Sequence, residues 1–146
     1  MAVPFVACMA LVASLYSLPP RVLPSIHGVE GGQPGVVHVN TDGSEDYGVM
    51  QVNSRWLPAL SRYTRQPAEA VRQQLIGRPC FNIAAAGLIL RTYLNEAHGD
   101  LMQAVGDYHS HTPLLNRTYQ SEVMQSAWSL FGGRQANAPT RAKASP

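Results

Sequence analysis

The sequence predicts a single, mostly helical domain of the α+β class, with one small β-hairpin between the second and third helices. Apolar residues recur with helical spacing over most of the chain, and turn residues separate two β-type stretches within 36–52. The length of 146 residues fits one hydrophobic core. Because a two-stranded hairpin is unstable alone, we expect it to pack against the helices and to form a cleft with them.

The first helix is predicted near the N-terminus, and four apolar residues share its stripe: Phe5, Met9, Val12 and Leu15. Residues 1–18 are nearly all apolar or small and the first basic residue is Arg21, whereas a secretory signal begins with a charged segment. The run is also short for a membrane span of about 20 residues. We therefore interpret it as part of the folded domain; a targeting remnant is the alternative.

The second helix is predicted over 21–29, after the break at Pro19-Pro20. Gly31-Gly32 ends it, so Glu30 occupies the last helical turn. A carboxylate at this position faces the negative end of the helix dipole, which favours its protonated form. Such a position is unusual for a purely structural Glu.

The hairpin is predicted to begin with a strand over 36–39. Residues 40–44 (Asn-Thr-Asp-Gly-Ser) are typical of a turn, and β-type spacing resumes over 46–52. Further helices are predicted over 56–63, 67–75, from an Asn82 cap to about Glu96, from Asp100 onward, and over 114–131. The predicted domain is thus 1–131, and 132–146 is expected to be a disordered tail because its composition lacks periodicity.

Composition and motifs exclude several classes of function. Charged residues make up only 14% of the chain and the formal net charge is +2, so we expect no nucleic-acid partner. The chain has no Gly-rich phosphate loop and no Gly-x-Ser-x-Gly motif, so no cofactor is expected. Three histidines raise the question of a metal (His98, His109 and His111), but no zinc-type spacing completes them, and no metal site is predicted. A monomer is the default expectation.

Two features carry candidate chemistry. Glu30 and the acidic residues of the hairpin (Asp42, Glu45 and Asp46) border the same predicted cleft. Cleavage of a glycosidic bond needs an acid with a raised pKa and a group that stabilises the cationic sugar, whereas the alternative for Glu30 is a solvated helix end. Asp42 is more typical of a turn former in Asp42-Gly43. Cys8 and Cys80 are either bridged or free, and the count alone leaves both open.

The hairpin sequence closely resembles that of animal-type lysozymes. The similar stretch runs over residues 40–56, NTDGSEDYGVMQVNSRW. By this resemblance Glu30 corresponds to the family's acid and Asp46 to its nucleophilic or stabilising carboxylate. The resemblance implies a lysozyme-like fold and cleavage of peptidoglycan.

The remaining motifs resemble the small lytic transglycosylases associated with type III and type IV secretion, conjugation and pili. They are Gly48 to Asn53 (GVMQVN), Pro79 to Ala84 (PCFNIA) and Ala104 to His109 (AVGDYH). The resemblance spans about residues 8–128. It implies a Cys8–Cys80 disulfide, a periplasmic location and peptidoglycan glycan strands as substrate, with secretion or conjugation machinery as a further partner.

The same resemblance implies substrate-binding residues: Gly48, Met50, Gln51, Asn53, Tyr108 and His109. Several have structural alternatives: Asn53 as a helix cap, Met50 as packing below the cleft, and Tyr108 at the edge of the core. The sequence departs from the family at Glu30-Gly31-Gly32, where the family has Glu-Ser, so a hydrogen-bonding group near the acid is lost.

Both families imply that Glu30 protonates the bond between N-acetylmuramic acid and N-acetylglucosamine. A lytic transglycosylase then forms a 1,6-anhydro ring, whereas a hydrolase uses water; Tyr108 and the bacterial motifs favour the first outcome and Asp46 favours the second. The alternative outside enzymes is a lysozyme-like module that binds peptidoglycan without cutting it. A purely structural secretion component, without glycan affinity, is the third possibility.

Overall fold

The computed structural model describes residues 2–132, and these residues adopt the predicted α+β architecture. The α-helices are α1 (Val6–Leu15), α2 (Val22–Glu30), α3 (Leu57–Thr64), α4 (Ala68–Gly77), α5 (Pro79–Glu96), α6 (Leu101–His109) and α7 (Pro113–Ala127). The strands are β1 (Val37–Val39), β2 (Glu45–Tyr47) and β3 (Val52–Asn53). A 3-10 turn, η1 (Ser54–Trp56), precedes α3, and a π-helical turn, η2 (Trp128–Gly132), follows α7.

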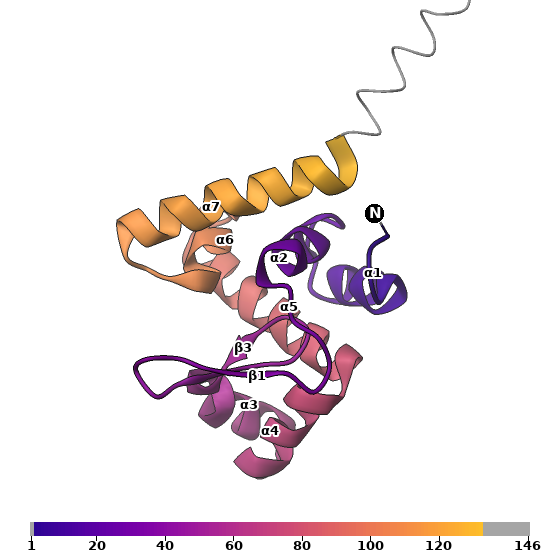
Figure 1. Ribbon diagram of the computed structural model, residues 1–146, viewed down its shortest axis with the longest axis vertical. Helices are drawn as coiled ribbons and strands as arrows, with labels where there is room; N and C mark the ends of the chain where they lie inside the picture. Colours follow the sequence, from indigo (N-terminus) through magenta and orange to yellow (C-terminus); the bar gives the residue numbers. More distant parts are fainter. Residues whose placement is uncertain (1, 133–146) are drawn as a thin grey trace, which may run out of the picture.

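Helix α5 runs through the middle of the molecule and separates two groups of elements (Figure 1). Helices α1, α2, α6 and α7 lie on one side, and the sheet lies with α3 and α4 on the other. Because α5 packs against both groups, it is buried around much of its surface and contributes Ile83, Ile89 and Leu90 to the core. One hydrophobic core therefore connects the helical part to the sheet.

The sheet differs from the predicted hairpin, because it has three antiparallel strands in the order β1-β2-β3. The predicted second strand over 46–52 is interrupted at Gly48 and Gln51, which both have a positive φ, of 65° and 52°. A backbone hydrogen bond from Gln51 to the Gly48 carbonyl closes this turn at 3.2 Å. The chain is thereby reversed, and β3 pairs with β2 through Asp46 opposite Asn53.

The prediction that Asn82 caps the long helix was wrong. Helix α5 begins at Pro79, whose ring suits the first helical turn, and Asn82 lies inside the helix and is fully buried. The Asn82 side chain accepts a hydrogen bond from the Met50 amide and donates to the carbonyls of Tyr47 and Leu75, each at 2.8 Å. The hydrogen bonds of Asn82 therefore connect the sheet region and α4 to the central helix α5.

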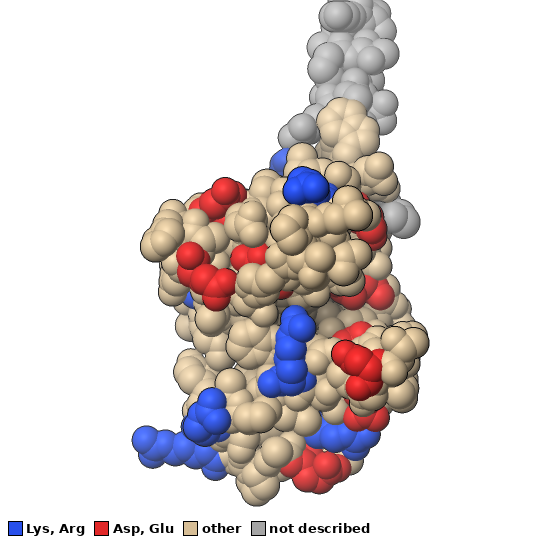
Figure 2. Space-filling view, turned by 90° about the vertical axis from the view of Figure 1, so that its left-hand side faces the viewer, with Lys and Arg blue, Asp and Glu red and all other residues tan. Residues whose placement is uncertain are grey.

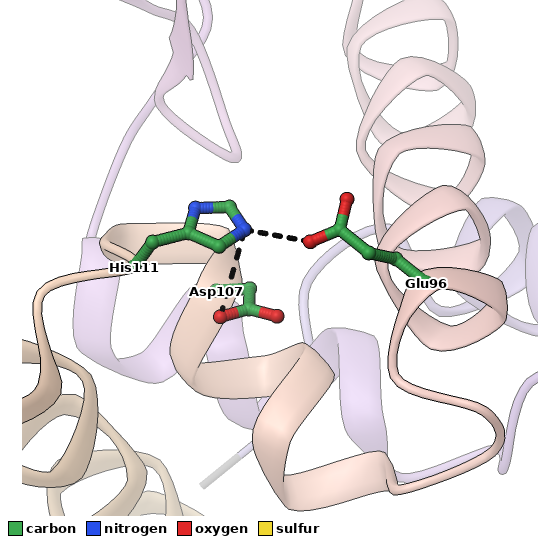
Figure 3. A group of neighbouring side chains, drawn as sticks. All are labelled: Glu96, Asp107 and His111. Carbon is green, nitrogen blue, oxygen red and sulfur yellow. Dashed lines mark hydrogen bonds and ion pairs between the residues drawn. The ribbon is translucent and has the colours of Figure 1, made fainter.

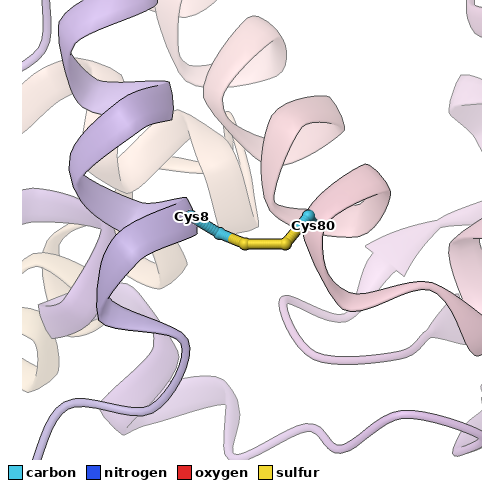
Figure 4. Close-up of a disulfide and its surroundings, with 2 residues drawn as sticks. All are labelled: Cys8 and Cys80. Carbon is cyan, nitrogen blue, oxygen red and sulfur yellow. A yellow bond between two sulfur atoms is a disulfide. The ribbon is translucent and has the colours of Figure 1, made fainter.

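Helix α1 belongs to the domain, with Met9 and Val12 buried in the core. The predicted stripe fails at Leu15, which is 65% exposed. Residues of α1 are apolar on nearly every side, so apolar spacing does not identify its inward face. A disulfide joins Cys8 in α1 to Cys80 in the first turn of α5, with the Cα atoms 5.5 Å apart (Figure 4), as the family resemblance implies.

The last predicted helix, 114–131, is α7 followed by the π-helical turn. Gly132, which the sequence assigned to the tail, ends that turn and is buried. Residues 133–146, the rest of the expected tail, lie outside the described residues.

Charged side chains on the face shown in Figure 2 lie as separate groups among uncharged residues. Among helices of the described part, 2–132, none combines the length and the apolar character that crossing a membrane requires.

Candidate active site

Glu30 is the last residue of α2 and points into a cleft between the helical part and the sheet. The helix ends there because Gly31 adopts the left-handed conformation, with φ of 65°, and its amide bonds the His27 carbonyl at 2.8 Å. The side chain is half-buried. The helix end therefore presents one carboxyl group to the cleft with little freedom to move.

Burial raises the pKa of Glu30 from 4.5 to about 7. A hydrogen bond from Tyr119 lowers this pKa, whereas the negative charges of Asp46 and Glu122 raise it further. At neutral pH both protonation states of Glu30 are therefore populated. A carboxyl group with this pKa can donate a proton and then accept one at the same pH.

Tyr119 on α7 donates a hydrogen bond from its hydroxyl to Oε2 of Glu30 at 2.5 Å. Tyr119 is buried, and its ring stacks on the imidazole of His109, with centroids 4.9 Å apart and an interplanar angle of 10°. Burial raises the pKa of the Tyr119 hydroxyl, so the group stays a proton donor in this bond. The hydrogen bond from Tyr119 fixes one oxygen of Glu30, whose side chain lines the cleft.

Asp46 on β2 is held by two asparagine side chains. Asn53 donates to its Oδ1 at 2.9 Å, and Asn40 donates to its Oδ2 at 3.1 Å. Both oxygens are thus acceptors, and neutral amide groups orient the carboxylate. The arrangement places a second carboxylate on the sheet side of the cleft, opposite the helix that carries Glu30.

The cleft has a volume of about 290 Å³. Its polar lining residues come mainly from the turn and strands of the sheet, and its apolar lining residues are Val52, Trp56, Ile89 and Leu115. The lining residues are Glu30, Asn40, Asp42, Ser44, Asp46, Gln51, Val52, Asn53, Arg55, Trp56, Ile89, Tyr108, His109, Ser110 and Leu115. A mixture of amide, carboxylate and apolar groups suits a sugar, which has polar edges and apolar faces.

Four of the predicted substrate-binding residues line this cleft: Gln51, Asn53, Tyr108 and His109. Asn53 also caps η1, because its Oδ1 accepts a hydrogen bond from the Arg55 amide at 2.9 Å. The Tyr108 hydroxyl donates to the Met50 carbonyl at 2.9 Å, so its hydrogen bond holds the turn before β3 and not the Glu30 carboxyl group. Asn53 is thus a helix cap and Tyr108 packs at the edge of the core, which are the structural alternatives that the sequence left open.

Gly48 and Met50 do not line the cleft. Met50 is fully buried beneath it in the core. A Cβ at Gly48 would lie 2.4 Å from the Leu75 carbonyl oxygen and 2.7 Å from Nδ2 of Asn82. Both residues therefore shape the turn that carries Gln51, and the motif Gly48 to Asn53 combines structural positions with cleft positions.

Asp42 is a turn former, as its position before Gly43 predicts. Its Oδ1 accepts hydrogen bonds from the amide and the hydroxyl of Ser44, at 2.9 and 2.6 Å. These bonds lower the pKa of the exposed Asp42 carboxyl.

The family's Ser corresponds to Gly31, where a Cβ would meet no atom within 4 Å but where the φ of 65° lies in the left-handed region that favours glycine. Gly32 has a steric reason of its own. A Cβ at position 32 would lie 2.0 Å from the Gly48 carbonyl oxygen and 2.6 Å from that of Val49. Only glycine therefore allows the segment after Glu30 to approach the turn of the sheet this closely. The Gly32 carbonyl also lies 3.0 Å from Nε2 of His27, so a side chain of α2 holds the same segment.

Sequence reasoning missed Tyr119. A signal was present, because the buried residues Asn116, Tyr119 and Val123 are spaced along one face of α7. That spacing indicates an inward-facing tyrosine, but it does not indicate that the partner is a glutamate on α2.

Comparison with known proteins agrees with the geometry. The family model described as "Transglycosylase SLT domain" matches residues 8–131. Protein IpgF of Shigella flexneri is 30% identical over 106 residues, which cover 72% of this chain and 66% of IpgF, just under two thirds of its length. Invasion protein IagB of Salmonella typhimurium is 25% identical over 125 residues, which cover 85% of this chain and 74% of IagB. The mostly helical fold with its small sheet and the match over residues 8–131 place this protein in the transglycosylase SLT domain family.

Proposed function

We propose that the protein is a peptidoglycan lytic transglycosylase that cleaves the β-1,4 bond between N-acetylmuramic acid and N-acetylglucosamine. The observation that carries this proposal is Glu30, a carboxyl group with a pKa of about 7 at the edge of a polar cleft. An acid is needed because an alkoxide is a poor leaving group, and a pKa near the working pH suits both donation and recovery of the proton.

The reaction begins when protonated Glu30 gives its proton to the glycosidic oxygen. The bond from the muramyl anomeric carbon to that oxygen breaks, and the N-acetylglucosamine hydroxyl leaves. Asp46 supplies a fixed negative charge across the cleft, which stabilises the cationic sugar that develops. The hydrogen bonds from Asn40 and Asn53 keep this carboxylate in place.

The second step closes a ring. The 6-hydroxyl of the muramyl residue attacks its own anomeric carbon, and Glu30, now ionised, takes the proton of that hydroxyl. The product is 1,6-anhydro-N-acetylmuramic acid, no water is consumed, and Glu30 returns to its protonated form. A neighbouring hydroxyl has a high effective molarity, so it outcompetes water when the cleft positions it.

We assign Gln51, Asn53, Tyr108 and His109 to substrate contact because they line the cleft beside Glu30. The amide groups of Gln51 and Asn53 suit the N-acetyl groups of the glycan. Gly48 and Met50 act through the turn beneath. Peptidoglycan as substrate implies a periplasmic location, and the similarity to secretion-associated transglycosylases supports local wall opening for a secretion, conjugation or pilus assembly.

Asp46 favours a second candidate, a lysozyme-type hydrolase. In that mechanism the same carboxylate captures or stabilises the sugar, and water completes the reaction with Glu30 as base. A third candidate, a module that binds peptidoglycan without cutting it, does not need an acid with a raised pKa.

Mass spectrometry of the soluble products from purified peptidoglycan distinguishes these candidates. We expect anhydromuramyl products from the native protein and a loss of at least about 100-fold in Glu30→Gln. Glu69→Gln, on the exposed surface of α4, is the matched control and should retain activity. Reducing-end muramyl products would identify a hydrolase, and the absence of products where a control lysozyme works would identify the binding module.

A further inference from the structure

A second cluster of polar side chains lies outside the cleft, where α5, α6 and the loop before α7 meet (Figure 3). Glu96 ends α5, Asp107 lies on α6, and His111 lies in the loop. One donor atom from each of the three side chains lies within 4.8 Å of the other two. Nε2 of His111 is 2.8 Å from Oε1 of Glu96 and 3.7 Å from Oδ1 of Asp107.

Asp107 is the unusual member, because its side chain is only 3% exposed. Its Oδ1 accepts hydrogen bonds from the neutral amides of Asn116 and Gln103, at 2.9 and 3.0 Å. Among the ion pairs of residues 2–132, its single ionisable partner is His111. A buried carboxylate is costly unless a positive charge faces it, and here two carboxylates converge on the same imidazole nitrogen.

We propose that Glu96, Asp107 and His111 bind a first-row divalent transition-metal cation, of which Zn²⁺ fits the donor set best. One imidazole nitrogen and two carboxylate oxygens from separate side chains are ligands that Zn²⁺ accepts, and water completes a tetrahedral shell. The side chains of Glu96 and His111 are both 55% exposed, so solvent reaches the open position. The cation supplies the positive charge that the two carboxylates otherwise lack.

The surroundings of the three ligands support a built site. Asn116 and Gln103 fix Asp107 by hydrogen bonds, as outer partners fix metal-binding carboxylates. The ring of Tyr93 packs edge-on against His111, with centroids 5.2 Å apart, and limits rotation of the imidazole. Nε2 of His111 and Oε1 of Glu96 exchange their mutual hydrogen bond for bonds to the metal, and the imidazole proton is then carried on Nδ1.

The site has a structural consequence for the cleft. Asp107 and His111 flank Tyr108, His109 and Ser110, which line the cleft. A cation that joins α5 to α6 and to the loop before α7 therefore stabilises the segment from which these residues project. The inference is independent of the proposed reaction, because it concerns binding and stability only.

The test is calorimetric titration of metal-free protein, 1–146, with ZnCl₂, together with thermal unfolding in ZnCl₂ or chelator. We expect one Zn²⁺ per chain and a rise of about 5 °C or more in Tm at saturation. His111→Ala and Glu96→Gln should each weaken binding at least about tenfold. His98→Asn, at an exposed position with a φ of 52° that Asn tolerates, and Glu69→Gln are matched controls and should bind as the native protein does.

Three results would overturn the proposal. The first is a native protein that shows no Zn²⁺ binding, which leaves the cluster as an ion pair of His111. The second is Zn²⁺ binding that both His111→Ala and Glu96→Gln retain. The third is loss of binding in Glu30→Gln, which would place the ion in the cleft. Because the readouts are affinity and Tm, a protein without transglycosylase activity still tests the site.

Discussion

The hydroxyl of Tyr119 donates a hydrogen bond to Oε2 of Glu30 and thereby joins α7 to the end of α2 across 89 residues of sequence. This bond favours the ionised carboxylate, whereas burial favours the protonated form and is the larger effect. The balance leaves the pKa of Glu30 at about 7. The hydrogen bond from Tyr119 and the charge of Glu122 can each be removed by a separate substitution.

Tyr119→Phe removes the hydrogen bond that lowers the pKa of Glu30, so this pKa should rise. An acid catalyst must be protonated, so the alkaline limit of the pH–activity profile should move to higher pH. The profile is measured by product release from peptidoglycan. Tyr63→Phe, at an exposed position on α3, should leave the profile unchanged; a shift to lower pH in Tyr119→Phe would contradict the role assigned to Tyr119.

Glu122→Gln should move the same limit in the opposite direction. The negative charge of Glu122 raises the pKa of Glu30, so its removal favours the ionised form and lowers that pKa. Glu122 is exposed and the smallest of the four contributors, so its shift should be smaller than that of Tyr119→Phe and should shrink further in high salt. An unchanged profile at low ionic strength would show that this charge does not reach Glu30.

Glu30 should also make stability depend on pH. Its folded-state pKa of about 7 is raised above its value of 4.5 in the unfolded chain. The folded protein therefore binds more protons between pH 4.5 and 7, so its stability falls as the pH rises through that window. Glu30→Gln should be more stable than the native protein by up to about 3 kcal/mol at pH 8, with the difference vanishing near pH 4. Urea unfolding at both pH values measures it, and an equal difference at both would be contrary to this account.

Asn82→Ala should destabilise the fold by about 3 kcal/mol or more. The change leaves the Met50 amide and the carbonyls of Tyr47 and Leu75 without their buried partner. The midpoint of urea unfolding reports the loss. Asn95→Ala on the exposed face of the same helix should change stability by about 0.5 kcal/mol or less, and similar losses in the two variants would argue against a special role for Asn82.

Local signals predicted much of the fold and the position of Glu30 at the end of α2. Gly31-Gly32 indicates the end of α2, and hence the place of Glu30 in its last turn, from adjacent residues alone. The break at Gly48 was not predicted, because the apolar alternation over 46–52 continues through it. The turn becomes evident only when Leu75 and Asn82 are seen packed against Gly48, and both lie far along the chain.

Contacts between distant helices escaped sequence reasoning for the same physical reason. The spacing on α7 indicates that Tyr119 faces inward, yet the identity of its partner depends on how α7 crosses α2. Similarly, Glu96 and His111 belong to different segments, and no spacing motif relates them. Periodicity determines which face of a helix is buried, whereas the packing of helices determines which side chains meet.

The cross-link between Cys8 and Cys80 makes the stability of the protein depend on the compartment that holds it. A loop closed over a sequence separation of 72 residues contributes about 4 kcal/mol in the chain-entropy model. That amount is a large fraction of the roughly 5–15 kcal/mol by which domains are stable. In a reducing compartment the thiols stay separate, α1 loses its covalent tie to α5, and the chain is easier to unfold. Oxidation restores that tie, so the more stable form of the chain is the one that an oxidising compartment maintains.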